Sequence, residues 1–386
     1  MTGAMDFELT ETAKEARDAA RAFARRLKPL AAAWDEEEAI PAEFLREGGR
    51  LGFFGLLVPE EYGGAGLDAL SYAVTMEELA GANASYQGCL SVHNSLVCAA
   101  VMRFGTPEQK SRYLPALAAG ETIGAYSLSE PGAGSDAGSI VTSAVADGDG
   151  FKIDGTKSWV SNGGIAGLFV VFVSTSPASA SRGVSCFLVE KGTPGFTVGR
   201  KERKMGLRAS DTRELNFHDC RVPRSALLGS LNGGFKIAMS LLDGGRVGIG
   251  AQAVGIAQAA LDEAVAYAKA RRQFGRSISE FQLIQAKIAD MATGVEASRL
   301  LVRRAAALLA RGERCTKEAS MAKLFATTTA NRVAYDALQI HGGNGYVREF
   351  PVERYFRDAR AGEIYEGTSE IQRLIIAREV LRAKIP

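Results

Sequence analysis

The stretch IQAKIADMATGVEASRLLVRRAAALL, residues 284–309, decides the fold of the last third of the chain. Its apolar and small residues recur at alternating steps of four and three: Ile284, Ile288, Met291, Val295, Ser298, Val302, Ala305 and Leu309. That period is the seam of a left-handed helical bundle. The preceding segment carries a similar stripe of Val254, Leu261, Val265 and Ala268. The sequence therefore predicts a C-terminal four-helix bundle over residues 233–386.

Upstream of the bundle, the helical period gives way to short β-prone segments. They include residues 123–130, 140–146 and 151–160, and the continuous apolar runs Leu168–Val173 and Val184–Val189. Runs of this length between turns are typical of buried strands. The sequence Asp147-Gly-Asp-Gly150 favours a tight turn between two of them. We therefore expect a central β-barrel-like domain over residues 121–232.

The first third of the chain is predicted to be helical. Thr12 and Glu15 fit a capping box, and apolar residues then recur at helical spacing from Ala16 to Leu30. A chain of 386 residues is also too long for one ordinary core. The expected fold class is α+β and multidomain. Its domains are an N-terminal helical domain (1–120), the central β domain (121–232) and the C-terminal bundle (233–386).

Composition and charge narrow the function classes. The net charge of +2 gives no basic field for nucleic acid, and no apolar run approaches the length that spans a membrane. The five cysteines are scattered without a CxxC pair, and the three histidines are far apart. That pattern favours reduced thiols and no metal site. The N-terminal residues lack a targeting signal, so we expect a cytoplasmic protein.

Five segments are richer in glycine and polar residues than their elements require. They are YSLSEPGAGSD (126–136), KSWVSNGG (157–164), RRQFG (271–275), QIHGGNGY (339–346) and RDARAGEIYEGTSE (357–370). Such loops expose backbone N–H groups and allow close approach to a ligand. Each segment also has a structural interpretation: a strand-end turn, a core tryptophan, a charged connection, a helix C-cap, or an acidic residue near a helix N-terminus. No segment matches GxGxxG, so a Rossmann site is not supported.

In this order, the five segments resemble the acyl-CoA dehydrogenase family over nearly the whole chain. The most specific matches are Tyr126–Asp136, Gln339–Tyr346 and Ile364–Gln372. The resemblance looks closest to the short-chain and general bacterial members, whose three-domain layout is similar to the one predicted above. It implies the acyl-CoA dehydrogenase fold, FAD as cofactor and an acyl-CoA substrate. It also implies a homotetramer (a dimer of dimers) and an electron-transfer flavoprotein as electron acceptor.

The resemblance also implies which residues contact FAD. Around the isoalloxazine ring and the pyrophosphate it implies Tyr126, Leu128, Ser129, Ser135, Trp159 and Ser161. Around the adenine half, largely across a subunit interface, it implies Arg271, Gln273, Phe274, Phe281, Gln282, Gln339, Gly342 and Gly343. Thr368 and Glu370 are implied as further FAD contacts.

Glu366 falls on the family's catalytic glutamate, which removes the substrate's α-proton while the β-hydrogen leaves as hydride to flavin N5. The acidity of an α C–H beside a thioester must be raised before a carboxylate with a pKa of ~4.3 can deprotonate it. In the family, the glutamate's backbone N–H and a flavin ribitol hydroxyl stabilise the developing enolate oxygen. Arg246 is implied as the second catalytic residue, a charge partner that positions the glutamate loop. Residues implied along the substrate are Ser135, Asp243, Arg246, Tyr365 and Gly367.

Two departures from relatives narrow the subclass. Some isovaleryl-type and long-chain relatives carry the base just before the arginine of the other helix, and this chain has Gly245 there. Glutaryl-specific relatives use an arginine near the pocket mouth, where this chain has Gln87. The expected product is a trans-2-enoyl-CoA made from a short- to medium-chain substrate. Straight, branched and cyclic acyl groups stay open.

Two rival functions compete with this interpretation. An oxygen-using flavin oxidase on the same fold is the nearer one. Glu366 counts against a nitroalkane oxidase, which has aspartate at this position, and a length of 386 residues counts against the larger acyl-CoA oxidases. A non-enzymatic helical scaffold is the second, and it leaves the glycine clusters unexplained.

Overall fold

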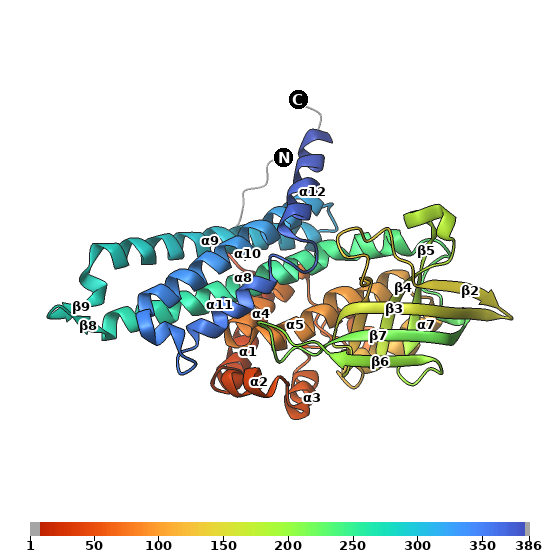
Figure 1. Cartoon of the computed structure of the whole chain (residues 1–386), viewed down its shortest axis with the longest axis horizontal. Coiled ribbons are helices and arrows are strands. Elements are labelled where there is room, and N and C mark those ends of the chain that lie inside the picture. The colour runs from red at the N-terminus through yellow and green to blue at the C-terminus, as the bar shows by residue number, and fades with distance from the viewer. Residues whose placement is uncertain (1–7, 383–386) are drawn as a thin grey trace.

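The computed structural model describes residues 8–382. The first part of the chain is helical (Figure 1). Its helices are α1 (Glu11–Leu27), η1 (Lys28–Leu30), α2 (Ala31–Glu37), α3 (Ala42–Arg50), η2 (Glu60–Tyr62), α4 (Ala69–Ala82), α5 (Ala84–Ser91), the π-helix η3 (Val92–Cys98), α6 (Ala99–Phe104) and α7 (Pro107–Ala118). The predicted helical first third is therefore confirmed.

The start of α1 corrects one prediction. Its N-cap is Thr10, whose side chain accepts a hydrogen bond from the Ala13 backbone N–H at 3.2 Å. Thr12 and Glu15 lie inside the helix, so the capping box expected there is wrong. Both threonines satisfy the local rule for a cap. Leu9, just before the cap, is buried in a cluster with Ala13 and Val74, which favours a helix that starts ahead of Thr12.

A curled sheet follows the helical region (Figure 1). Its strands are β1 (Gly124–Ser127), β2 (Ser143–Asp147), β3 (Gly150–Ser161), β4 (Leu168–Ser174), β5 (Val184–Glu190), β6 (Phe196–Lys201) and β7 (Thr212–Pro223), with short helices η4 (Pro177–Gly183) and η5 (Arg224–Ala226). The strand order is β1-β4-β2-β3-β7-β6, and β5 pairs with β4. Strands β2 and β3 form the expected hairpin, with Asp147 opposite Gly150.

Strand β4 joins the sheet to the N-terminal helices. Every residue of β4 is buried, because both of its faces are covered. Leu168, Val170 and Phe172 pack with the helical cluster that contains Val97 and Leu117. The alternating residues on the other face pack inside the sheet. A strand covered on both faces has the continuous apolar run that the sequence shows at 168–173.

The last part of the chain is helical again. Its elements are α8 (Gly234–Ala270), β8 (Arg272–Gln273), β9 (Arg276–Ser277), η6 (Ile278–Glu280), α9 (Gln282–Ala310), α10 (Thr316–His341), η7 (Gly342–Tyr346), α11 (Val352–Ala361) and α12 (Ser369–Arg382). The predicted seam of α9 is confirmed at its centre, where Met291, Val295, Ser298, Val302 and Ala305 are buried.

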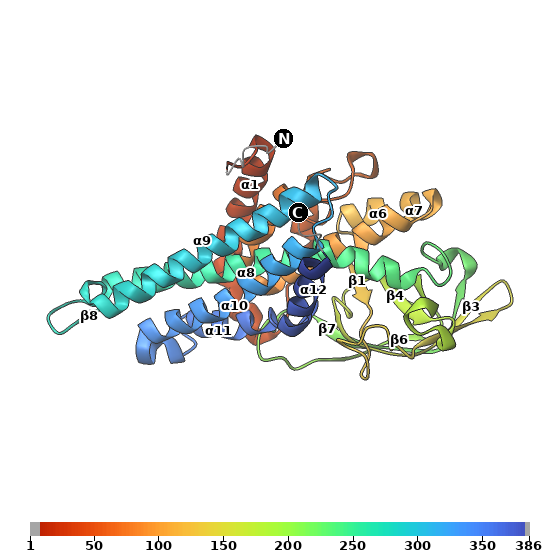
Figure 2. The same cartoon turned by 90° about the horizontal axis from the view of Figure 1, so that it is seen from above.

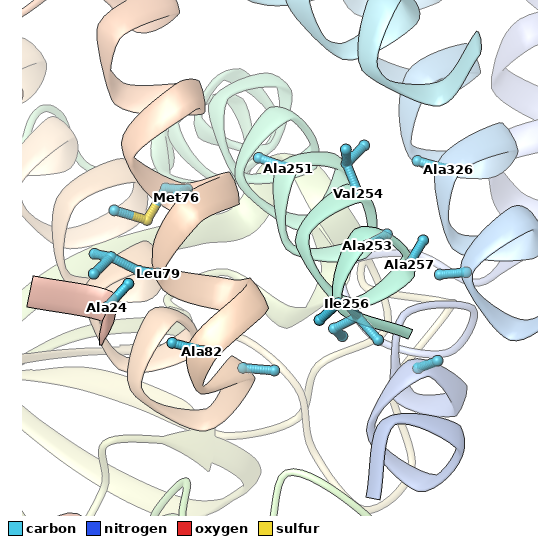
Figure 3. Close-up of a cluster of buried hydrophobic side chains, with 14 of the residues drawn as sticks. Ala24, Met76, Leu79, Ala82, Ala251, Ala253, Val254, Ile256, Ala257 and Ala326 are labelled. Carbon is cyan, nitrogen blue, oxygen red and sulfur yellow. The ribbon is translucent and has the colours of Figure 1, made fainter. Parts of the chain in front are cut away.

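Helix α8 is the central element of the core. It runs from the sheet to the β8–β9 hairpin, with α9 and α10 beside it (Figure 2). Figure 3 shows Ala251, Val254 and Ala257 of α8 between α4, which carries Met76 and Leu79, and Ala326 of α10. Small side chains on α8 let these helices pack closely. This packing fixes the position of α8 between α4, α9 and α10.

The spacing of Ile371, Leu374, Ile375, Arg378 and Leu381 predicts an amphipathic last helix, and α12 packs less of this stripe than the pattern indicates. The exposed fractions of Leu374 and Leu381 are 66% and 84%, and only Ser369 and Gln372 of α12 are buried. The helix contacts α10 near its start and projects from the rest of the molecule (Figure 1), which leaves Leu374, Val380 and Leu381 exposed. None of the helices described between residues 8 and 382 is long and apolar enough to cross a membrane.

Candidate active site

Glu366 lies in a tight turn between α11 and α12. Its φ is 51° and that of Gly367 is 91°, so two consecutive residues adopt the left-handed conformation. This conformation is unfavourable for a residue with a side chain and costs roughly 1–3 kcal/mol. The Gln372 side-chain amide holds the turn by donating to the carbonyl oxygens of Glu366 (3.2 Å) and Gly367 (3.0 Å). The surrounding structure therefore maintains a strained backbone at Glu366.

The carboxylate of Glu366 is buried, and its two oxygens have no hydrogen-bond partner among the described residues. Gly245 of α8 faces it, since a Cβ at Gly245 would lie 2.2 Å from Oε2. Burial raises the pKa of Glu366 to about 7, although the charges of Lys323 and Arg246 oppose that rise. An unpartnered carboxylate with a pKa near neutrality can act as a general base.

Arg246 is held by its own helix rather than by Glu366. Its Nη1 donates to Asp243 Oδ1 at 2.8 Å, and Asp243 Oδ2 accepts from the Thr316 hydroxyl at 2.7 Å. The Arg246 side chain is 6% exposed, and its Nε has no partner among the described residues. Arg246 therefore places a positive charge near Glu366 without fixing the carboxylate by a direct hydrogen bond.

Tyr126 lies on β1, and Leu128 and Ser129 follow it in the loop after the strand. The Tyr126 hydroxyl is buried without a partner among the described residues, and burial raises its pKa well above the ordinary value, with Glu366 contributing. Behind the loop, the ammonium of Lys157 donates to Leu128 O at 3.0 Å and to Glu130 Oε1 at 2.8 Å. This buried ion pair fixes the backbone of residues 128–130.

Trp159 and Ser161 lie on β3 next to this loop. The pairing of β3 with β7 shifts register between Lys157 and Val160, and Trp159 has a φ of 61° in this bulge. The indole is 64% exposed, although it is a large apolar side chain. Ser158 N donates to Ser129 O at 2.9 Å, which ties the bulge to the loop after β1. The bulge therefore presents a flat ring beside a backbone-rich loop.

A polar network lies directly beside Glu366. The hydroxyl of the adjacent Tyr365 donates to Gln252 Oε1 of α8. The Gln252 amide donates in turn to Gln87 Oε1 (2.6 Å) and to Ala84 O (2.9 Å). Gln87 also donates to Gly248 O at 3.2 Å. These buried groups are mutually satisfied, so they form a closed polar wall between α5 and α8.

A second group of predicted residues lines an open cavity of about 1010 Å³ at the β8–β9 hairpin. The cavity is lined by the predicted Arg271, Gln273, Phe274, Phe281, Gln282, Gly342 and Gly343, and by residues that we did not predict, among them Tyr267, Arg276 and His341. Gln339 precedes them in the last turn of α10 and is not part of the lining. The Phe274 ring is 94% exposed with a φ of 51°.

The two groups of predicted residues are far apart within this chain. The helical segment from Arg246 to Arg271 spans roughly 37 Å at 1.5 Å per residue. The hairpin lies at the end of α8 farthest from the sheet in both views (Figures 1 and 2). The structure thus brings Glu366, Arg246, Asp243, Tyr365, Gly367 and Tyr126 together, and it leaves the hairpin residues elsewhere.

Three further predicted residues lie in the loop after β1 and around the start of α12. Ser135 is exposed in the loop after β1, and Glu370 is exposed in the first turn of α12. The Thr368 hydroxyl accepts from Ile371 N at 3.4 Å, as a helix cap does. Ser135 and Glu370 are accessible to a ligand, whereas Thr368 is half-buried.

Sequence reasoning missed the buried lysines Lys157 and Lys323. A single lysine in a helix or strand is usually solvated, so neither stands out by its residue type alone. For Lys323 a signal existed, because it shares a helix face with Ala319, Ala322 and Ala326. Residues 8–382 contain no cluster of His, Cys, Asp or Glu that could hold a metal ion, and the five cysteines are buried and free.

Comparison with known proteins gives consistent matches along the chain. Three family models match: acyl-CoA dehydrogenase N-terminal domain at residues 10–121, middle domain at 125–220 and C-terminal domain at 232–381. The mitochondrial short-chain specific acyl-CoA dehydrogenase of Bos taurus is 50% identical over 97% of this chain and 92% of its own length.

Two solved structures are similar throughout. One comes from work on the electron transferring flavoprotein of Acidaminococcus fermentans and flavin-based electron bifurcation, with 46% identity and a TM-score of 0.97. The other is butyryl-CoA dehydrogenase from Megasphaera elsdenii, with 42% identity and a TM-score of 0.96. Each covers 98% of this chain and 100% of the other chain.

Proposed function

This chain belongs to the acyl-CoA dehydrogenase family, and we propose that it oxidises a short-chain acyl-CoA thioester to the trans-2-enoyl-CoA with Glu366 as the base. The observation that carries the proposal is the Glu366 carboxylate, which is buried, without a partner among residues 8–382 and held on a strained turn. Burying a carboxylate without partners costs free energy, and no structural role of Glu366 offsets that cost.

Glu366 is suited to removing a proton from carbon. Because burial raises its pKa to about 7, it gains basicity and is still substantially ionised near neutral pH. Its freedom from hydrogen bonds to the described residues leaves both oxygens able to take up the α-proton. The positive charges of Arg246 and Lys323 favour the ionised form before reaction. The backbone N–H of Glu366, in the same turn, is the candidate donor to the thioester oxygen.

Acyl-CoA dehydrogenases are FAD flavoproteins, and the residues present fit this cofactor. The exposed Trp159 ring and the Lys157-anchored loop at Leu128 and Ser129 would hold the flavin ring. The cavity at the hairpin, with the guanidinium groups of Arg271 and Arg276, would hold a phosphate-bearing adenine half. When bound, FAD supplies the acceptor for the β-hydrogen as hydride.

We propose that each FAD site is built from two protomers, as in the predicted homotetramer. The support is the separation of roughly 37 Å between Arg246 and Arg271 along α8, which is longer than one extended dinucleotide. An electron-transfer flavoprotein as acceptor and a cytoplasmic location belong to the same proposal. The similarity to a structure from work on such a flavoprotein supports the acceptor.

The short acyl chain is supported by the wall beside Glu366. A long alkyl chain in this direction would break the hydrogen bonds among Tyr365, Gln252 and Gln87 and leave buried polar groups unpaired. Each such group would cost roughly 1–3 kcal/mol. The names of the relatives, short-chain specific and butyryl-CoA dehydrogenase, agree with this substrate class.

The test is anaerobic addition of butyryl-CoA to the purified yellow holoenzyme. We expect loss of flavin absorbance and formation of crotonyl-CoA, and a fall in kcat/KM from butyryl-CoA to octanoyl-CoA. Glu366→Gln should prevent this bleaching, and Glu43→Gln, at an exposed position on α3, is the matched control for removing a carboxylate. Unbleached flavin with every acyl-CoA would contradict the function. Rapid peroxide formation in air without another acceptor would instead favour the oxidase.

A further inference from the structure

Helix α10 carries a lysine in the interior of the bundle, Lys323, whose side chain has no exposed surface. It lies on the same buried face as Ala319, Ala322 and Ala326. Lysine is almost never fully buried unless it is paired, because taking its ammonium out of water is costly. Burial lowers the pKa of Lys323 to about 8, because the charged ammonium is less stable away from water. The contacts of this ammonium should therefore explain why it is buried.

The ammonium of Lys323 contacts the turn that carries Glu366. Its Nζ donates to Gly367 O at 2.7 Å, which is the next carbonyl after Glu366. Within residues 8–382, neither Lys323 nor Glu366 takes part in an ion pair within 4.0 Å. Lys323 therefore anchors the turn directly and acts on the carboxylate through space. A direct ion pair would occupy the oxygens that must accept the proton.

The ionisable groups around Glu366 come from every element packed against it. Positive charges come from Lys323 on α10 and Arg246 on α8. Three phenols also face it: Tyr72 on α4, Tyr126 on β1 and Tyr365 in the turn itself. Burial raises the pKa of Tyr72 to about 12 and raises that of the other two well above the ordinary value, so all three are neutral.

The two cations differ in how they are compensated. Arg246 donates to the Asp243 carboxylate at 2.8 Å, so its charge is largely balanced within α8. Lys323 has only a carbonyl as its hydrogen-bond acceptor among the described residues, and Glu366 is the foremost opposite charge acting on it, followed by Glu363 and Glu370. The uncompensated buried positive charge opposite Glu366 is thus that of Lys323.

We propose that Lys323 is a positioning residue of the reaction: its ammonium anchors the Glu366–Gly367 turn and supplies the buried positive charge that keeps Glu366 ionised near neutral pH. The proposal rests on the proposed function, since it gives Glu366 the role of base. Loss of this charge should move the ionisation of Glu366 to higher pH, while loss of the hydrogen bond should loosen the turn at every pH.

Two variants separate the charge from the hydrogen bond. Lys323→Gln removes the charge and keeps an N–H donor for Gly367 O, whereas Lys323→Met removes both. In the pH profile of flavin reduction by butyryl-CoA, we expect the acidic limb of both variants to move up by about one pH unit. The rate of Lys323→Gln should fall about tenfold at pH 6 and recover at pH 9. That of Lys323→Met should also stay low at pH 9.

An infrared titration checks the same shift without turnover. The C=O stretch of protonated Glu366, assigned by its absence in Glu366→Gln, should persist to higher pH in both Lys323 variants. Lys287→Met is the matched control, because Lys287 on α9 pairs with Asp336 outside the site. Its infrared and kinetic titrations should follow those of the unmodified enzyme.

The proposal would be overturned if Lys323→Gln shifted neither the acidic limb of the pH profile nor the infrared titration of Glu366. If Lys323→Met does not fold, as judged by flavin content and Tm, the titrations of Lys323→Gln are sufficient to support or overturn it. The proposed function fails separately: Glu366→Gln would then bleach as fast as the unmodified enzyme. An inert Glu366→Gln together with unshifted Lys323 variants would overturn only the role of Lys323.

Discussion

Glu366 combines a left-handed backbone, buried oxygens without partners among the described residues and a raised pKa in one residue. Each feature is unfavourable for folding, and together they leave a carboxylate that is available for proton transfer. Such concentrations of strain and desolvation are typical of active sites. For this single residue, the family resemblance implied the role of base. Only the folded structure shows the buried environment that makes this role feasible.

Removing the charge of Glu366 should change stability in a pH-dependent way. Its pKa rises from the ordinary 4.5 to about 7 on folding. The folded state therefore holds a proton that the unfolded state releases between these values, and stability is lost as pH rises through about 7. Glu366→Gln avoids this loss, so its Tm relative to the unmodified protein should be higher at pH 8 than at pH 5.

The corresponding free-energy difference is at most about 3 kcal/mol between these two pH values. Thermal unfolding of both proteins at matched flavin content measures it. An offset in Tm that is the same at pH 5 and pH 8 would argue against a strongly raised pKa.

Gly245 provides a second prediction at the residue scale. A Cβ there would meet Oε2 of Glu366 at 2.2 Å, the flexible end of a side chain, so Gly245→Ala should fold and displace the carboxylate. Misplacement by about 1 Å can cost on the order of 100-fold in rate. Gly244→Ala is the control, since its Cβ would make only contacts of 3.9 Å. Equal rates for the two variants would show that Gly245 does not set the position of the base.

At the scale of single elements, the buried pair Lys157–Glu130 links β3 to the loop after β1. Glu130 accepts from Val141 N (2.7 Å) and Thr142 N (3.0 Å) as well as from Lys157. Breaking a buried pair by removing one partner costs about 3–5 kcal/mol. We expect Lys157→Met to lower Tm and to lose flavin on gel filtration.

A matched control for this pair is Lys152→Met on the same strand, because Lys152 pairs with Asp219 at the surface. Exposed pairs contribute about 0–1 kcal/mol. If Lys157→Met keeps the flavin content and Tm of Lys152→Met, the buried pair is not needed to hold the loop.

Elements with a strong apolar pattern were predictable from the sequence. The seam of α9 and the run of β4 follow from burial on one face or on both. The start of α1 was not predictable, because Thr10 and Thr12 satisfy the same capping rule and packing chooses between them. The exposure of α12 was not predictable either, since an apolar stripe does not specify the surface that covers it.

At the scale of the whole molecule, the predicted cofactor residues divide between two places. Separation along a sequence gives no distance, and the position of the hairpin at the far end of α8 emerges only from the folded chain (Figure 2). Lys157 and Lys323 were not predicted for a related reason. Burial of a single charged residue depends on which helices and strands meet around it.

A site shared between protomers predicts complementation. Glu366→Gln should inactivate one part of the site and Arg271→Ala together with Phe274→Ala the other. Mixed oligomers contain some sites with neither change, so unfolding and refolding the two inactive proteins together should restore about a quarter of the activity. Activity of the mixture no higher than that of either variant would contradict a composite site.

The central claim is that Glu366 removes the α-proton, and the most direct test is rapid anaerobic mixing of Glu366→Gln holoenzyme with butyryl-CoA. Glutamine keeps the size of the side chain and cannot accept the proton. We predict that flavin bleaching slows by at least about 100-fold relative to the unmodified enzyme, because a positioned base contributes roughly 10²–10⁴-fold. Bleaching at an unchanged rate would contradict the account.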